Sequence, residues 1–296
     1  MKTELTYKRV QTNGIHLHVV NAGPEDGPMV LFLHGFPEFW RGWLKQITPL
    51  ANAGYRVTVP DQRGYNLSDK PKEVAAYHID ILTQDILGLI DIAGRESAIV
   101  VGHDWGAAVA WHLATICPER VDKLVILNVP HPVVMVETLR SSLSQLRKSW
   151  YMFFFQIPWL PEWLLGWKNA KGASELLLRS GNPDTFTAED LDHYREAWTQ
   201  PGALTGMLNW YRSAVRNGLK GSLGSSPSNP RITVPTLMLW GKQDVALSYK
   251  MAQPSIDLCE DGELIIFEDA THWVQHDEAE KVTDYLLAFF NKEVKT

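Results

Sequence analysis

Residues 98–106 of the chain read Ala98-Ile99-Val100-Val101-Gly102-His103-Asp104-Trp105-Gly106. The apolar run before Gly102 predicts a short buried strand at 98–101, and the residues that follow predict a helix from about 105 to 116. Gly102 and Gly106 flank Asp104 in the pattern of a nucleophile elbow, a sharp turn between strand and helix that lifts its middle side chain above a sheet. The stretch therefore predicts a carboxylate nucleophile. Helix capping by Asp104 is the alternative interpretation.

Apolar segments on either side of this stretch predict the rest of a sheet. Strands are expected at 17–21, 29–33, 55–59, 124–127, 236–240 and 263–267, and helices at 40–53, 79–93 and 278–290. Short apolar strands that alternate with amphipathic helices indicate a parallel sheet covered on both faces. Such sheets bind ligands at the carboxyl ends of their strands.

The alternation is lost in the middle of the chain. Helical patterns prevail there, with six of the twelve tryptophans and the run Phe153-Phe154-Phe155. We therefore expect a core in two parts, 1–129 and 232–296, and an inserted helical cap at 130–231. The Gly-, Ser- and Pro-rich residues 221–230 are expected to form a surface connection.

Composition and charge exclude several classes of protein. Hydrophobic residues make up 45% of the chain, charged residues 21%, and the formal net charge is −6. This balance offers no basic field for phosphates or anionic lipid, so neither nucleic acid nor a membrane is expected as a partner. The first ten residues are polar and no apolar run is long enough to span a bilayer, so we expect a cytoplasmic protein, either a monomer or a homodimer.

A second glycine-containing turn follows an earlier strand. His34-Gly35-Phe36-Pro37 occupies the place where a fold with a nucleophile elbow supplies half of its oxyanion hole. The backbone N–H groups of Phe36 and Trp105 are the expected donors, and Gly35 and Pro37 shape the turn. His34 is expected to be structural and to bond nearby backbone.

An acid and a histidine complete a possible catalytic triad. Asp244 follows a late predicted strand, and His272 lies between the last strand and the last helix. The chain order of nucleophile, acid and histidine fits the elbow. His276 is the alternative histidine, and Asp257 and Asp269 are the alternative acids. They stay open because only position in the chain favours His272 and Asp244. After the strand at 124–127, where some relatives keep the acid, this chain has Asn128.

The type of nucleophile restricts the substrate. The sequence contains no G-x-S-x-G, so a serine esterase would lack its nucleophile. A carboxylate that attacks a saturated carbon yields a stable ester, so the electrophile should be an sp³ carbon with a leaving group. A ring oxygen leaves as an alkoxide and requires a proton donor such as tyrosine, whereas a halide requires only N–H donors.

Taken together, these segments resemble the epoxide hydrolases of the α/β-hydrolase superfamily over nearly the whole chain. The matching residues, in order, are 34–38 (His-Gly-Phe-Pro-Glu), 61–65 (Asp-Gln-Arg-Gly-Tyr), 102–106, Asp244 and His272. The resemblance implies an α/β-hydrolase fold, with a mostly parallel eight-stranded sheet, helices on both faces and a helical cap. Segments 150–156 and 208–212 resemble those that carry the family's two cap tyrosines, which implies Tyr151 and Tyr211 as proton donors. Tyr194 is expected to be a packing residue with its hydroxyl at the surface.

The implied reaction converts an apolar epoxide and water to a vicinal diol. Asp104 would form an ester with the epoxide, and His272, oriented by Asp244, would activate the water that hydrolyses it. No metal or organic cofactor is implied. The expected pocket is lined by Phe36, Pro37, Trp105, Phe154 and Trp273. A haloalkane dehalogenase that uses the Trp105 indole, or a non-catalytic binding protein on the same fold, are the alternatives.

Overall fold

The computed structural model of the chain describes residues 4–219 and 231–293. Within these ranges eight strands form one sheet, in the order β1-β2-β4-β3-β5-β6-β7-β8. The strands are β1 (Thr6–Thr12), β2 (Ile15–Ala22), β3 (Met29–Leu33), β4 (Arg56–Pro60), β5 (Ala98–His103), β6 (Val121–Leu127), β7 (Thr236–Gly241) and β8 (Gly262–Phe267).

Strand β5 lies at the centre of the sheet, between β3 and β6. Val100 of β5 pairs with Leu31 on one side and Leu124 on the other. All three side chains are fully buried, which accounts for the continuous apolar run in this part of the sequence. Strands β3 to β8 run parallel, whereas β2 pairs antiparallel with both β1 and β4. The elbow thus begins on the most enclosed strand.

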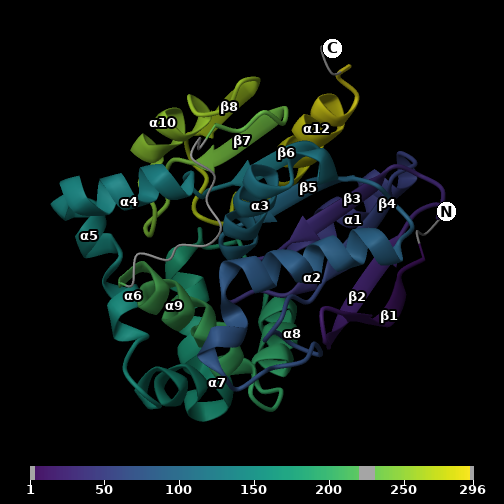
Figure 1. The fold of residues 1–296 in the computed structure, drawn as a ribbon. Helices are drawn as coiled ribbons and strands as arrows, with labels where there is room; N and C mark the ends of the chain where they lie inside the picture. Colours follow the sequence, from purple (N-terminus) through teal and green to yellow (C-terminus); the bar gives the residue numbers. More distant parts are fainter. Residues whose placement is uncertain (1–3, 220–230, 294–296) are drawn as a thin grey trace.

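Helices cover the sheet (Figure 1), where α2 and α3 lie in front of the strands. These two helices contact one another, and α1 contacts α12. The helices of this part are α1 (Leu44–Asn52), α2 (Ile79–Ile92), α3 (Trp105–Ile116), α10 (Ala252–Ile256), α11 (Val274–Asp277) and α12 (Ala279–Phe290). Short 3₁₀ helices are η1 (Trp40–Trp43), η2 (Val74–Tyr77), η3 (Pro118–Arg120) and η4 (Tyr249–Met251).

A run of helices is inserted between β6 and β7, and we call α4 to α9 the inserted helices. They are α4 (Pro132–Ser141), α5 (Leu143–Lys148), α6 (Trp150–Phe154), α7 (Leu160–Ser180), α8 (Ala188–Trp198) and α9 (Ala203–Leu219). In Figure 1 they occupy the left and lower side of the molecule. Their chain begins at the carboxyl end of β6, so they lie near the end of the sheet where ligands bind.

The expected eight-stranded, mostly parallel sheet is confirmed. The expected helix at 40–53 is wrong in its first turn, which is the 3₁₀ helix η1, with α1 following it. The cap and core boundaries at 129/130 and 231/232 stay predictions, and the expected surface connection at 221–230 lies outside the described residues. No helix in the described ranges is both long and apolar enough to cross a membrane.

Strand β1 was not expected from the sequence. It forms the edge of the sheet, and most of its side chains are exposed, so it lacks an apolar run. A local signal was nevertheless present in Asn13-Gly14, which joins β1 to β2 with φ angles of +44° and +76°. Asn-Gly favours two-residue hairpin turns because both positions require positive φ.

Candidate active site

Asp104 stands at the turn between β5 and α3, as the elbow pattern predicts. Its φ of 48° and ψ of −122° place it in a strained conformation for a residue with a side chain. A β-carbon on Gly106 would collide with the backbone oxygen of Leu33, which explains why this position requires glycine. The Asp104 side chain makes no capping hydrogen bond to α3, so it remains free for chemistry.

The turn after β3 holds one oxygen of this carboxylate. The backbone N–H of Phe36 donates to Asp104 Oδ1 at 2.7 Å. A β-carbon on Gly35 would meet the Asp104 side chain, so glycine is what allows the two turns to approach. Trp105 is the first residue of α3, and its N–H is one of those that a helix leaves without an internal partner. The two expected oxyanion donors therefore flank Asp104.

His272 faces the second oxygen of Asp104. Its Nε2 lies 3.5 Å from Asp104 Oδ2, and its Nδ1 lies 2.7 Å from Asp244 Oδ2. The other oxygen of Asp244, Oδ1, accepts from the backbone N–H groups of Ala246 and Leu247. This network fixes the carboxylate and makes His272 Nδ1 a donor, which leaves Nε2 directed at Asp104.

Asn128 also orients the acid, although it received no role from the sequence. Its Nδ2 donates to Asp244 Oδ2 at 2.9 Å, and its Oδ1 accepts from the backbone N–H of Gly241 at 2.9 Å. The residue is fully buried at the end of β6 with a φ of +55°. The neutral amide of Asn128 donates a hydrogen bond to Asp244, whereas a carboxylate at this position would repel the Asp244 carboxylate.

The charges of the three central groups depend on one another. Burial alone would lower the pKa of His272, but the Asp244 and Asp104 carboxylates raise it from 6.5 to about 10. Burial alone would raise the pKa of Asp104, but His272 and the Phe36 N–H hold it below its ordinary value. The free site therefore holds an ionised nucleophile beside an imidazolium.

Tyr151 on α6 and Tyr211 on α9 lie together, close enough to Asp104 to feel its charge. Their ring centroids are 5.8 Å apart, and the Tyr211 ring lies 5.0 Å from that of Trp105 and 5.3 Å from that of Phe36. Burial raises the pKa of both hydroxyls, and the nearby Asp104 carboxylate raises each further. Both tyrosines are therefore neutral hydrogen-bond donors across the working pH range.

The remaining residues of the expected pocket have different neighbours. The Trp273 ring packs at 5.0 Å from His272, while the Phe154 ring packs against Trp150 at 5.8 Å. The backbone oxygen of Pro37 accepts from the indole of Trp198. Phe36 and Trp105 thus lie beside the tyrosine pair, and contact of any of the five with substrate stays a prediction.

Known proteins are similar to this chain in sequence and fold. The profile of the alpha/beta hydrolase fold family matches residues 28–279. The chain is 41% identical over 289 residues to "Epoxide hydrolase 1" of Caenorhabditis elegans, covering 96% of this chain and 70% of that protein. It is 50% identical over 284 residues to "AB hydrolase superfamily protein YfhM" of Bacillus subtilis, covering 96% and 97%. A crystal structure of Bacillus megaterium epoxide hydrolase with an inhibitor aligns with a TM-score of 0.89 at 31% identity, covering 96% of this chain and 100% of that one.

The chain belongs to the epoxide hydrolase family. The resemblance inferred from the sequence is thereby confirmed, together with the hydrolase class. Neither the comparisons nor the family profile assigns roles to individual residues, so the site rests on its geometry.

A buried polar network below the site of this epoxide hydrolase family member was missed from the sequence. Glu38 is fully buried and accepts from Tyr194 Oη at 2.7 Å and from His276 Nε2 at 2.7 Å. The expectation of a surface hydroxyl on Tyr194 is wrong, because that hydroxyl is buried against this carboxylate. His103 Nδ1 lies 3.3 Å from Glu38 Oε2, and its Nε2 lies 2.8 Å from the backbone oxygen of His272. Glu38 follows the turn after β3, and its contacts therefore link that turn to α8, α11 and the end of β5. Its pKa lies well below the ordinary value because His276 and His103 outweigh its burial.

The alternative residues lie in other surroundings. His276 bonds Glu38, and the side chains of Asp257 and Asp269 are exposed, so Asp244 is the acid that contacts His272. His34 is structural, as expected. Its ring bonds the backbone oxygen of Gly35 at 3.1 Å and accepts from the backbone N–H of Gln62 at 3.0 Å.

Segment 61–65, which the epoxide hydrolase family shares, has a structural role in this chain. Asp61 accepts from the backbone N–H of Trp40 at 3.0 Å and from Asn66 Nδ2 at 2.8 Å. Arg63 forms a buried ion pair with Asp85 of α2 at 2.6 Å. These bonds tie the loop after β4 to η1 and to α2.

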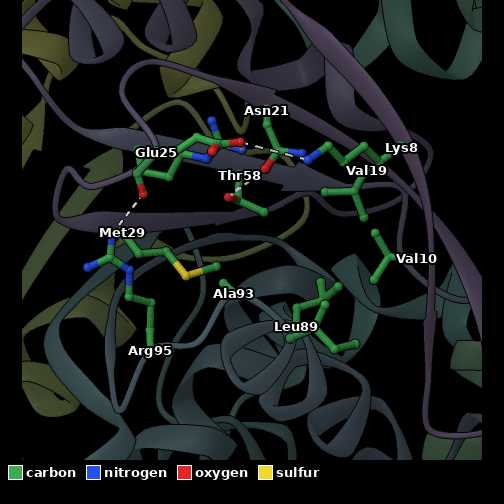
Figure 2. A pocket seen from close by; sticks show the side chains of 12 residues that line it. Lys8, Val10, Val19, Asn21, Glu25, Met29, Thr58, Leu89, Ala93 and Arg95 are labelled. Carbon is green, nitrogen blue, oxygen red and sulfur yellow. Dashed lines mark hydrogen bonds and ion pairs between the residues drawn. The ribbon is translucent and has the colours of Figure 1, made fainter.

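A separate cleft lies away from the candidate site, between the β1–β2–β4 end of the sheet and α2 (Figure 2). Its volume is about 310 Å³. None of the candidate catalytic residues lines it. Figure 2 shows Glu25 between Lys8 and Arg95, and the guanidinium of Arg95 donates to the backbone oxygens of Glu25 and Gly27. Lys8 Nζ and Arg56 Nη2 lie 4.0 and 3.9 Å from Glu25 Oε1, so the cations of this cleft are already engaged within the chain.

Proposed function

We propose that this chain opens an apolar epoxide to a vicinal diol through a covalent ester on Asp104. The class of reaction follows from the family, whose members compared above include named epoxide hydrolases. The observation that carries the mechanism is the Asp104 carboxylate, which has one oxygen on the Phe36 N–H and the other facing His272. The inserted helices would act as the cap that supplies Tyr151 and Tyr211.

In the first step, Asp104 attacks a ring carbon from the side opposite the C–O bond. An ester bond forms as the ring C–O bond breaks, and its electron pair moves to the oxygen. The oxygen takes a proton from one of the two tyrosines while the other donates a hydrogen bond. An alkoxide is far more basic than a phenol, even one with a raised pKa, so the transfer is favourable.

Formation of the ester would then switch the role of His272. The Asp104 carboxylate is one of the two charges that raise the pKa of His272 to about 10. Once Asp104 is a neutral ester, that charge is lost and the pKa of His272 falls. The proton that His272 releases returns to the tyrosine that protonated the product oxygen and restores its hydroxyl. His272 therefore becomes a neutral base only once the ester has formed, which is the stage at which a base is needed.

In the second step, His272 deprotonates a water that attacks the ester carbonyl carbon of Asp104. The negative charge on the former carboxylate oxygen is stabilised by the Phe36 and Trp105 N–H groups. The Phe36 N–H already bonds Asp104 Oδ1 at 2.7 Å in the free enzyme, so this donor needs no rearrangement. Asp244 and Asn128 keep the imidazole in place as it gains charge. Collapse of the intermediate breaks the ester C–O bond, and the departing diol oxygen takes the second proton of the water. The diol leaves, and Asp104 is again a carboxylate beside a protonated His272.

A haloalkane is the alternative substrate, because the buried indole N–H of Trp105 could serve as a halide donor. Dehalogenation of a haloalkane would leave Tyr151 and Tyr211 without a role. Cytoplasmic location and a monomeric or homodimeric state stay predictions.

Turnover of styrene oxide beside 1-bromobutane tests the proposal. We expect the diol from the epoxide and little bromide release from the haloalkane. Preferential turnover of 1-bromobutane would replace the proposal with the dehalogenase. Turnover of neither by an enzyme that forms no adduct on Asp104 would reject the mechanism for such substrates.

A further inference from the structure

Large apolar side chains are unusually exposed on α4 to α7. Among the described residues, eighteen such side chains are exposed, and twelve of them lie between Val133 and Leu178. All four exposed tryptophans are in this group: Trp150, Trp159, Trp163 and Trp167. A contiguous exposed apolar surface usually marks an interaction site. We call the exposed side of residues 132–180 the α4–α7 face.

The helices of this face follow one another along one side of the molecule (Figure 1). Contacts join α4 to α5 and α5 to α6, and only five residues separate α6 from α7. On α6, Trp150 and Phe153 are three residues apart and therefore share a side. Both are more than half exposed, at 62% and 57%. Tyr151 instead contacts Tyr211, so α6 presents one side to the candidate site and another to the solvent.

The backbone is in unfavourable conformations at one of these tryptophans and directly after another. Trp159 has a φ of +55° and is 73% exposed. Its backbone oxygen accepts from the N–H of Trp163 at 3.0 Å, which starts α7. Trp167 begins a break in α7 where Lys168, Asn169 and Ala170 all have positive φ, from +47° to +59°. Strain of this kind persists where structure or function requires it.

The charge of the α4–α7 face differs from that of the chain as a whole. Residues 132–180 contain six lysines and arginines and three glutamates, a net charge of +3, although the whole chain carries −6. Exposed cations are distributed along it at Arg140, Arg147, Lys168, Lys171 and Arg179. Lys168 Nζ also lies 4.6 Å from the centre of the Trp167 ring. The overall negative charge, which argued against a membrane partner, therefore does not describe this face.

We propose that the α4–α7 face docks on the surface of a bilayer that contains anionic phospholipid. Tryptophan, phenylalanine and leucine insert at the level of the lipid headgroups, and lysine and arginine bind anionic headgroups. A second copy of the chain fits less well, because a two-fold contact would bring the same positive face against itself. Docking goes beyond the proposed reaction and does not depend on it. Docking would place the apolar interior of the bilayer next to α6, the helix that carries Tyr151.

Vesicle co-sedimentation of the full chain tests the docking. Phosphatidylcholine vesicles are compared with mixed phosphatidylcholine and phosphatidylglycerol vesicles, at low and high salt. We expect binding to the mixed vesicles that weakens as salt screens the charges. Equal binding to both lipids, or no binding to either, would overturn the proposal.

Two pairs of variants separate the apolar and charged contributions. Trp159→Asn with Trp163→Gln removes two exposed rings, and asparagine tolerates the left-handed conformation at 159. Arg147→Glu with Lys171→Glu reverses two charges and should weaken binding about 25-fold or more, since each cation near an anionic surface contributes about fivefold. Both pairs should reduce binding while circular dichroism shows an unchanged fold.

Matched controls lie on other surfaces of the protein. Tyr7→Gln with Ile92→Gln replaces apolar side chains of similar exposure, 56% and 57%. Lys8→Glu with Lys281→Glu reverses two exposed charges. Control variants that lose binding as strongly as the test variants would refute a specific face. Analytical ultracentrifugation provides a further check, since a dimer abolished by the tryptophan pair would assign the face to a second copy and overturn docking on lipid.

Discussion

Removal of the two tyrosine hydroxyls tests the part of the mechanism that separates epoxides from haloalkanes. Tyr151→Phe and Tyr211→Phe each keep the ring, so the contacts of Tyr211 with Phe36, Trp105 and Phe155, at centroid distances of 5.3, 5.0 and 4.9 Å, should survive. The hydroxyls are lost from a buried site next to an anion. The effect should therefore fall on chemistry more than on folding.

The expected magnitude follows from the bond that each hydroxyl makes to the departing oxygen. A hydrogen bond to a charged group contributes about 1.5–3 kcal/mol. At about 1.4 kcal/mol for each factor of ten, each single variant should alkylate Asp104 about 10- to 150-fold more slowly. Each variant keeps one donor, so alkylation is slowed and not abolished. The double variant lacks both and should be slower by at least the product of the two effects, about 100-fold or more.

Rapid-quench measurement of the first turnover with styrene oxide isolates this step from ester hydrolysis. Tyr55→Phe is a control, because its hydroxyl donates to Asn291 at 3.1 Å, away from Asp104. It should alkylate at the wild-type rate. A double variant with an unchanged alkylation rate would refute protonation by the tyrosines. An equal loss in the control would show that the rates report on folding.

The other predictions concern the triad. Asp104→Ala should abolish diol formation without unfolding the protein, because the side chain is the nucleophile and caps no helix; diol production by the folded variant would contradict the ester mechanism. His272→Gln should form the ester and then stall, giving one substrate mass in intact-protein mass spectrometry, and normal turnover would rule out its role as the base. The folded pKa of His272, about 10, exceeds the unfolded 6.5, so its stabilisation is complete below about pH 6.5 and is lost as pH rises toward 10. Urea unfolding should show this loss in the wild type but not in His272→Gln, and identical pH profiles would argue against the charged pair.

The sequence was informative wherever a local constraint acts on a few neighbouring residues. Gly102 and Gly106 identify the elbow because side chains there would collide with backbone. Asp244 and His272 could be placed because each follows a strand of the same parallel sheet, and parallel strands end at one edge. The hairpin turn at 13–14 was equally local but was not used, and β1 was missed.

Long-range polar contacts could not be predicted in the same way. Glu38 bonds Tyr194 and His276, which are 156 and 238 residues away along the chain. Nothing in the pattern around Glu38 distinguishes it from a solvated acid on a loop. Its role depends on burial, which brings together segments that have no periodicity in common.

Asn128 shows how such a contact alters the chemistry of the site. From the sequence it marked only a missing acid, yet its amide donates to Asp244 Oδ2, the same oxygen that holds His272 Nδ1. An acid at 128 would add a negative charge and raise the pKa of Asp244. The amide instead favours an ionised Asp244, which keeps one fixed negative charge beside His272 throughout the cycle. The Asp104 charge alone is then gained and lost, so ester formation itself controls when His272 becomes a base.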